Sequence, residues 1–196
     1  MEFDNKVRIY FLMLLFGFSY SGSNAQVSFG IRLEPLFFLT NIEKTENQSP
    51  IISNDHSFER SVNAALNFSL KPADRFLLSI RPGIIFGNNL YFGANAGIFA
   101  SYSLSLKSYI VTGINTHFTN GWGGHTYSGS GITTPYFVVG CGSNLSDKLP
   151  IEIQLNLPLN QQTYGTYREF KYPDYIRNNY KVAWLIKFGF GLDWEL

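Results

Sequence analysis

An alternation of apolar and polar residues, with a period of two, runs through most of this 196-residue chain. It is clearest at the C-terminus, where every even position from Tyr180 to Leu196 is apolar and the odd positions include Lys181, Lys187 and Asp193. A period of two gives a β-strand one apolar and one polar face, whereas an amphipathic helix repeats every 3.6 residues. The same alternation marks seven further segments, namely 27–39, 57–70, 76–87, 90–105, 109–119, 134–145 and 151–159. The sequence therefore predicts an all-β fold of eight strands.

The composition limits the classes of protein to which this chain can belong. Hydrophobic residues make up 45% of the chain, aromatic residues 17% and charged residues only 15%, which excludes intrinsic disorder. The formal net charge is +1, so the chain lacks the basic surface expected of a nucleic-acid-binding protein. Cys141 is the only cysteine, which excludes a disulfide framework and a multi-cysteine metal site.

The first 25 residues have the composition of a cleavable secretory signal peptide. Lys6 and Arg8 precede ten apolar residues at 9–18, and the segment ends in the small residues Ser23-Asn24-Ala25. Ten apolar residues are too few to span a bilayer as a helix. We therefore expect cleavage before Gln26 and a single exported domain at 26–196.

The links between the predicted strands differ in length. Residues 71–75, 107–108 and 146–150 form short turns, whereas 40–56, 120–133 and 161–179 are long and polar. Short periplasmic turns and long outer loops are typical of a closed antiparallel transmembrane β-barrel in a bacterial outer membrane. A soluble β-sandwich or a lipocalin-type barrel would show the same alternation, but with its apolar face turned inward.

The spacing of aromatic residues favours the membrane barrel. Phe58 and Phe68, for example, lie ten residues apart on the same face. Ten residues at about 3.3 Å each, tilted by about 45°, rise about 23 Å, close to the apolar band of about 25 Å between two aromatic girdles. The predicted girdle residues are Phe58, Phe68, Phe76, Phe86, Phe92, Tyr102, Trp184 and Trp194.

If the apolar face meets lipid, the polar face fills the lumen. By parity the lumen then holds four basic and four acidic residues, namely Arg32, Arg81, Lys181, Lys187, Glu34, Glu59, Glu152 and Asp193. The interior of a small barrel is only wide enough for side chains, so we expect these charges to pair within a network that includes Asn63, Asn67, Asn95, Gln154 and Asn156. A filled lumen predicts a plug; the alternatives are a narrow channel and a ligand-binding barrel.

The exported leader, the amphipathic strands and the run Phe188, Phe190, Leu192 and Trp194 at every second position resemble the small outer-membrane β-barrel proteins of the OmpA/OmpX type and the PorT-like barrels. In that family an aromatic-rich last strand is read by the barrel-insertion machinery. The last residue here is Leu196 where the family usually has Phe. The resemblance implies an outer-membrane location among lipid and lipopolysaccharide, and it implies no catalytic motif.

A second resemblance offers an enzymatic alternative. The segment from His117 to Gly121 is similar to the His-x-Ser-Asn segment of the outer-membrane lipid A deacylases. The resemblance implies an esterase in which the Thr119 hydroxyl attacks an ester and the His117 imidazole acts as base. Against it, Thr119 stands where the family has Ser, and no acidic residue lies between His117 and Asp147 to orient the imidazole.

The predicted outer loop 161–179 is a candidate for binding a partner or a phosphorylated headgroup, because it combines tyrosines with basic residues (Tyr164, Tyr167, Tyr172, Tyr175, Arg168, Lys171 and Arg177). The spacing of His56, His117 and His125 supports no metal site, and we expect no metal and no cofactor. The sequence thus predicts an integral outer-membrane barrel with a structural, adhesive or envelope-assembly role.

Overall fold

The computed structural model describes residues 26–46, 53–87, 91–119, 127–129, 131–146, 148–171 and 174–195. These residues form strands β1 (Gln26–Glu46), β2 (Ser53–Ala73), β3 (Phe76–Phe86), β4 (Gly93–Ser103), β5 (Ser108–Thr119), β6 (Tyr127–Gly129), β7 (Thr133–Ser146), β8 (Leu149–Pro158), β9 (Thr163–Lys171) and β10 (Asp174–Glu195). In the part of the chain that the structure describes, no helix is long and apolar enough to cross a membrane. The predicted signal peptide lies outside the described residues, so its cleavage stays a prediction.

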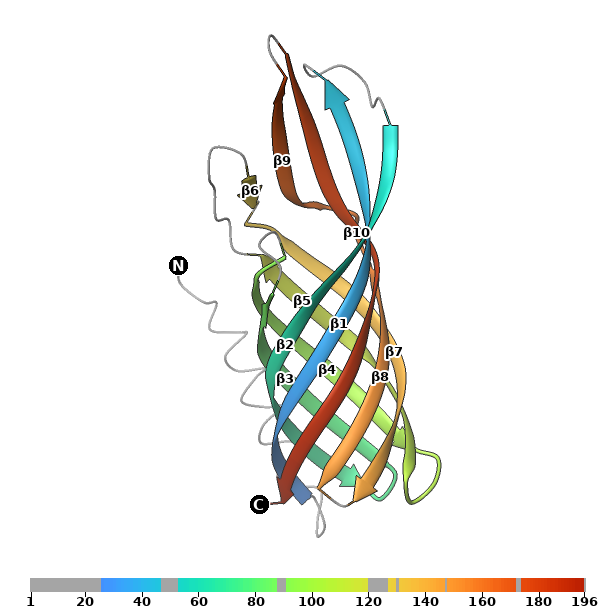
Figure 1. The fold of residues 1–196 in the computed structure, drawn as a ribbon. Coiled ribbons are helices and arrows are strands. Elements are labelled where there is room, and N and C mark those ends of the chain that lie inside the picture. The colour runs from blue at the N-terminus through green and yellow to red at the C-terminus, as the bar shows by residue number, and fades with distance from the viewer. Residues whose placement is uncertain are drawn as a thin grey trace, which may run out of the picture.

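The strands form one antiparallel sheet that closes on itself (Figure 1). Neighbours pair in the order β1, β2, β3, β4, β5, β7, β8 and β10, and β10 then pairs with β1. This closing seam is long, running from Ser28 opposite Glu195 to Glu46 opposite Ile176. Closure leaves no free strand edge in the ring. The predicted all-β antiparallel architecture is confirmed.

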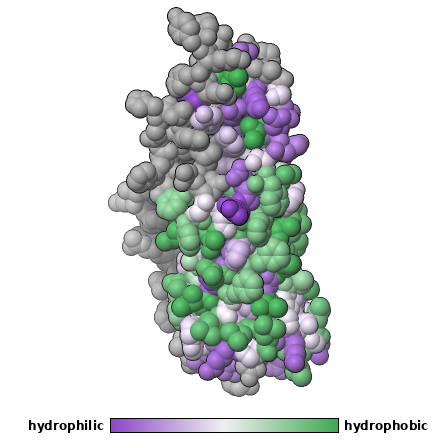
Figure 2. Space-filling view, in the orientation of Figure 1, coloured by the Kyte–Doolittle hydropathy of each residue, from purple (hydrophilic) through white to green (hydrophobic). Residues whose placement is uncertain are grey.

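The two faces of the ring have inverted polarity relative to a water-soluble barrel. Ile80 on β3 and Ile98 on β4 pair across the sheet, and their side chains are 51% and 65% exposed. The neighbouring residues Ser79 and Arg81 point inward and are buried. Figure 2 shows the result as a largely hydrophobic surface over the barrel wall, with hydrophilic surface gathered at the top of the view. The alternation therefore turns its apolar face outward.

Beyond the barrel the sheet continues as an extension. β2 pairs with β3 only as far as Val62, opposite Phe86, but pairs with β1 up to Ser53, opposite Lys44. β9 pairs with the first half of β10, and the short β6 pairs with β9. We call the outer extension residues 40–46 of β1, 53–57 of β2, 174–182 of β10, and β6 and β9 (upper part of Figure 1).

The outer extension corrects the predicted links at 40–56 and 161–179, which are largely strand. Polar residues such as Asn41 and Asn54 lie on their outward face, so these segments lack the apolar alternation that marked the barrel strands. Backbone pairing forms there all the same, because the neighbouring strands simply continue from the barrel. The third long link, 120–133, lies mostly outside the described residues and includes β6.

A bulge at Ala183 reverses the alternation in β10. Leu39 pairs with Trp184 and Thr40 pairs with Val182, so Ala183 has no partner on β1. Lys187 and Leu185 point inward below the bulge, and Val182 is buried in the core above it. A β-bulge adds one residue to one strand, which exchanges the faces of all that follows. The regular parity predicted for 180–196 is therefore wrong above Trp184, and Lys181 faces outward.

Deleting Ala183 tests its assignment as an extra residue outside the ladder. Leu39 would still pair with Trp184 and Thr40 with Val182, now as consecutive pairs, so Val182 and Tyr180 should keep their places in the core and the free energy of unfolding should change by less than about 1 kcal/mol. Val182→Ala keeps the bulge but removes a buried side chain, and it should lower the free energy of unfolding by about 1–3 kcal/mol in a urea titration. A deletion variant less stable than Val182→Ala would contradict this assignment.

Candidate functional site in the lumen

The guanidinium of Arg81 lies at the centre of a buried ionic network. Arg81 donates two hydrogen bonds to the Glu152 carboxylate, at 2.7 and 3.1 Å, and a third from Nε to the Asn67 side-chain oxygen at 3.1 Å. The Tyr109 hydroxyl donates to Glu152 at 3.1 Å. The guanidinium also lies 4.6 Å from the centre of the Phe99 ring. Arg81 is only 4% exposed, so this pairing takes place away from bulk water.

A second pair connects β1 with β10. The Lys187 ammonium donates to the Glu34 carboxylate at 3.3 Å, and the Asn63 amide donates to the same oxygen at 2.6 Å. Arg81 lies 3.9 Å from the other Glu34 oxygen, which joins this pair to the first. Glu34 and Lys187 are both buried.

A third pair lies nearer the strand ends. Arg32 donates to Asp193 at 2.8 Å, and the Asn67 amide donates to the other Asp193 oxygen at 3.3 Å. The buried network thus pairs three bases with three acids (Arg32, Arg81 and Lys187 with Glu34, Glu152 and Asp193). Such a balance matters because an unpaired charge in a low-dielectric interior is costly, and removing one partner of a buried pair typically costs about 3–5 kcal/mol.

Two of the predicted network residues lie elsewhere. Lys181 faces outward above the bulge and forms an ion pair with Glu43 at 2.6 Å. Glu59 lies on β2 beyond the last residue that pairs with β3, and it accepts a hydrogen bond from Ser57 at 2.8 Å. Lys181 lies outside the buried network because the bulge turns it outward. Glu59 lies outside it because β2 extends beyond the residues that pair with β3.

The predicted amides line the lumen. Gln154 donates to Glu152, and Asn95 donates to Asn115 at 3.4 Å. Asn156 is fully buried on β8. These side chains come from strands on different sides of the ring, so polar groups fill the lumen at this level.

An aromatic cluster occupies the next level, toward the outer extension. The hydroxyls of Tyr91 and Tyr136 form a hydrogen bond of 2.7 Å, and the ring centres of Tyr91 and Phe38 lie 4.5 Å apart. The Tyr164 hydroxyl is 3.0 Å from that of Thr40. Burial raises the pKa of the Tyr91 and Tyr164 phenols well above their ordinary value, so both stay neutral. The whole apolar cluster comprises Leu36, Phe38, Ile85, Tyr91, Phe99, Val111, Tyr136, Val138, Tyr164, Val182 and Leu185.

Parity alone does not predict this cluster, although the sequence holds a signal for it. Several strands contain consecutive apolar residues, such as Leu36-Phe37-Phe38-Leu39, Ile84-Ile85 and Phe137-Val138-Val139. Because neighbouring residues of a strand point to opposite faces, each such run must turn at least one apolar side chain inward.

His117 and Thr119, the residues of the esterase alternative, both point into the lumen. His117 is 0% exposed, and its ring centre lies 4.2 Å from that of Tyr91. Thr119 accepts a hydrogen bond from the Ile132 amide at 3.1 Å and donates one to the Ile132 carbonyl at the same distance. Among the described residues no acidic side chain pairs with His117. A substrate ester could not reach this imidazole without displacing the aromatic cluster.

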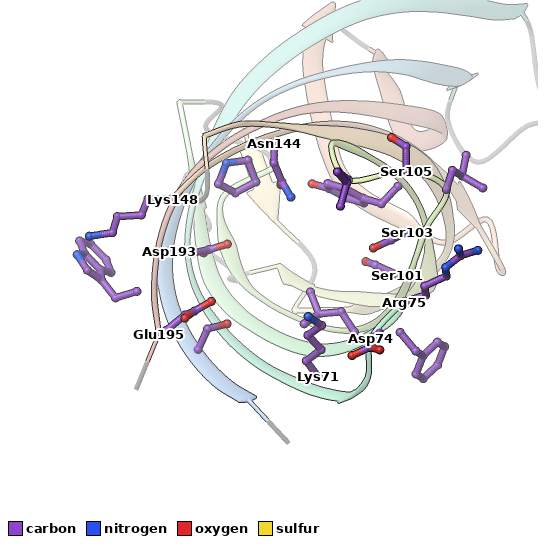
Figure 3. Close-up of a pocket in the computed structure, with 18 of the residues that line it drawn as sticks. Lys71, Asp74, Arg75, Ser101, Ser103, Ser105, Asn144, Lys148, Asp193 and Glu195 are labelled. Carbon is purple, nitrogen blue, oxygen red and sulfur yellow. The ribbon is translucent and has the colours of Figure 1, made fainter. Parts of the chain in front are cut away.

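The end of the lumen beside Gln26 and Glu195 opens as a vestibule of about 1130 Å³ (Figure 3). The vestibule reaches Arg32 and Arg81, where the ionic network begins. In Figure 3 the side chains of Lys71 and Asp193 point toward the opening. A wall with charges of both signs favours no single class of charged ligand.

The predicted girdle residues point outward in two groups. Phe68, Phe76, Tyr102 and Trp194 lie near the strand ends that surround the vestibule, and Phe58, Phe86, Phe92 and Trp184 lie toward the outer extension. Phe29 joins the first group, with its ring centre 5.3 Å from Phe68 and 6.1 Å from Trp194. Phe37 joins the second, with its ring centre 6.1 Å from Phe58.

The binding residues predicted at 161–179 lie on the β9–β10 hairpin. Tyr164 points into the aromatic cluster, whereas Arg168 and Arg177 are exposed and pair in register across the hairpin. The side chains of Lys171, Tyr172 and Tyr175 lie outside the described residues, as does His125. No cluster of three metal-ligating side chains occurs in the ranges that the structure describes.

A comparison with models of protein families gives no match for this chain, and a comparison with curated protein sequences gives none either. Comparison with solved structures does give matches. The outer membrane protein OprG from Pseudomonas aeruginosa is 12% identical, with a TM-score of 0.52 over 89% of this chain and 98% of that chain.

Two other structures match with lower TM-scores. Ail, the attachment invasion locus protein of Yersinia pestis, is 9% identical, with a TM-score of 0.31 over 87% of this chain and 100% of that chain. The translocator domain of the autotransporter NalP from Neisseria meningitidis is 11% identical, with a TM-score of 0.28 over 96% of this chain and 95% of that chain. The likeness to OprG shows the fold: this chain is a closed antiparallel β-barrel of the kind seen in that outer-membrane protein.

Proposed function

We propose that this protein is an integral outer-membrane β-barrel of eight strands, exported by a signal peptide at residues 1–25. The observation that carries the proposal is the inverted polarity of the barrel, with apolar side chains such as Ile98 exposed and charged side chains such as Arg81 buried. A soluble monomer rarely exposes an apolar patch of more than about 600 Å². An apolar band around the whole wall is stable only in contact with lipid.

The orientation follows from the two ends of the barrel. Short turns such as 74–75 lie at the end where β1 begins and β10 ends, and the outer extension lies at the other end. In bacterial outer-membrane barrels the short turns face the periplasm. We therefore assign the vestibule to the periplasmic side and the outer extension to the cell surface. The ring through β1, β2, β3, β4, β5, β7, β8 and β10 supports the strand count.

The contents of the lumen support a closed barrel over a channel. The ionic network and the aromatic cluster fill successive levels, and their side chains come from strands all around the ring. Side chains from different parts of the ring meet at these levels, as Arg81 meets Glu152 and Tyr91 meets Tyr136. They occupy the space that a channel would need. The burial of His117 likewise disfavours the lipid A deacylase alternative.

With a closed lumen, the cell-surface part carries the function. From Ser53 to Ser57, beyond the aromatic row of Phe58, β2 pairs with β1 and has no second strand beside it among the described residues. An exposed strand edge can accept an extended segment of another protein. This supports an adhesive, structural or envelope-assembly role over an enzymatic one. The aromatic C-terminal strand, with Trp194 facing outward, is proposed as the signal for the barrel-insertion machinery.

A lysine placed at the middle of the apolar band tests the membrane location. Ile98→Lys should cost about 2–4 kcal/mol of folding free energy in lipid vesicles, as found for lipid-facing positions near the midplane of a barrel. Leu106→Lys is the matched control, since Leu106 is fully exposed in the turn between β4 and β5. Urea titration of vesicle-folded protein, read by the heat-sensitive gel mobility of a folded barrel, measures both variants. Equal stability of the two would contradict a lipid-facing wall.

Electrical recording tests the closed lumen. Purified wild-type protein inserted in a planar bilayer should show no sustained conductance, because the ionic network and aromatic cluster block the path. Insertion is verified in the same sample by the heat-dependent gel shift. Discrete, long-lived current steps that scale with the amount of folded protein would instead support the channel alternative.

A further inference from the structure

The outer faces of β2, β1 and β10 form regular rows across the seam. Register places Phe58, Leu39 and Trp184 in one row, and Phe58 has its ring centre 6.3 Å from that of Trp184. The next row toward the cell surface holds His56, Asn41 and Lys181. The lipid-facing surface therefore changes from aromatic to polar between these two rows.

Arg60 is charged but lies on the apolar side of this boundary. It is exposed on the outer face of β2, two residues further into the apolar band than Phe58, and it pairs in register with Phe37. Phe37 has its ring centre 6.1 Å from that of Phe58, so aromatic rings flank the arginine. Among the described residues no acidic side chain forms an ion pair with Arg60. A cation that faces lipid without a protein partner is costly unless it reaches the interface or pairs with a charged group of the lipid.

The distance to the headgroup region is within reach of an arginine. Arg60 and His56 are four residues apart, about 13 Å along the strand, which is about 9 Å of height at a tilt of about 45°. A long basic side chain near a membrane boundary extends toward the interface while its stem stays in apolar surroundings. The guanidinium fork suits a phosphate group, which it can bind through two parallel hydrogen bonds.

The polar rows beyond the boundary carry an excess of positive charge. Lys181 and Arg177 lie on the outward face of β10, and the acidic residue Glu43 between them on β1 forms an ion pair with Lys181. The polar rows therefore hold two basic residues and one acidic residue, and Arg60 on the apolar side of the boundary adds a third positive charge. His56 is held by Asn41, with Nδ1 of the ring 2.9 Å from the amide oxygen.

We propose that this outer face of β2, β1 and β10 binds the phosphate group of a phosphorylated glycolipid of the outer leaflet. The Arg60 guanidinium holds the phosphate, and Lys181 adds positive charge one row above the aromatic boundary. The inference rests on the proposed membrane location and on the assignment of the outer extension to the cell surface.

Refolding into vesicles of two compositions tests the proposal. The protein is folded into phosphatidylcholine vesicles with and without bisphosphorylated lipid A, and lipid A retained after detergent extraction is counted by native mass spectrometry. We expect wild type to retain lipid A, Arg60→Gln to bind it about tenfold more weakly, and Lys181→Gln to show a smaller loss. Lys107→Gln removes the same charge from the opposite end of the barrel and should bind as wild type.

A second readout separates lost binding from a damaged fold. Without lipid A, Arg60→Gln should be as stable as wild type or more stable, because an unpartnered lipid-facing charge is removed. With lipid A, only proteins that keep Arg60 should gain stability. Retention of lipid A by Arg60→Gln at the wild-type level, or equal retention of a dephosphorylated lipid A by wild type, would overturn the proposal. Failure of the wild type to fold into either vesicle would instead contradict the membrane location itself.

Discussion

The pairing of β1 with β10 is the contact on which the rest of the molecule depends. It joins the first strand to the last, from Ser28 opposite Glu195 upward, and so turns a sheet with two edges into a ring. Backbone groups in a bilayer must be paired within the protein, because lipid offers them no partners. The same two strands continue past the barrel, so the seam that closes the ring also supports the outer extension.

Closure forces polar groups into a narrow interior, and the ionic network shows how this chain makes that arrangement stable. Arg81 from β3 reaches across to Glu152 from β8, and Lys187 from β10 pairs with Glu34 from β1. A slip of one residue in any of these strands would turn a charge toward the apolar exterior. The network therefore opposes alternative registers, in addition to any stability that the pairs contribute.

Strand content and facing were predictable because an apolar outer face and an inner face of packed polar groups impose a period of two. The features that were not predicted, the apolar cluster in the lumen and the bulge in β10, are those that depart from this period. Leu36 and Phe38 are apolar like their outward neighbours, so parity alone did not show that they fill the lumen. The bulge at Ala183 depends on how β10 pairs with β1, a long-range contact that leaves no mark in the local sequence. Lys181 was therefore placed in the network, although it faces outward.

The loss of the alternation is informative in its own right. Between Phe58 and His56 on β2, and between Trp184 and Lys181 on β10, the outward residues change from aromatic to polar although both strands continue without a break. A strand with water on its outer face has no need for apolar residues there, so under the proposed membrane location the alternation ends where lipid ends and not where the strand ends. Under that proposal, the ends of strands predicted from alternation mark the height of the membrane boundary. Arg60 lies just inside this height, between the outward and apolar residues Phe58 and Val62, and is the outward position in this part of β2 that differs from its neighbours.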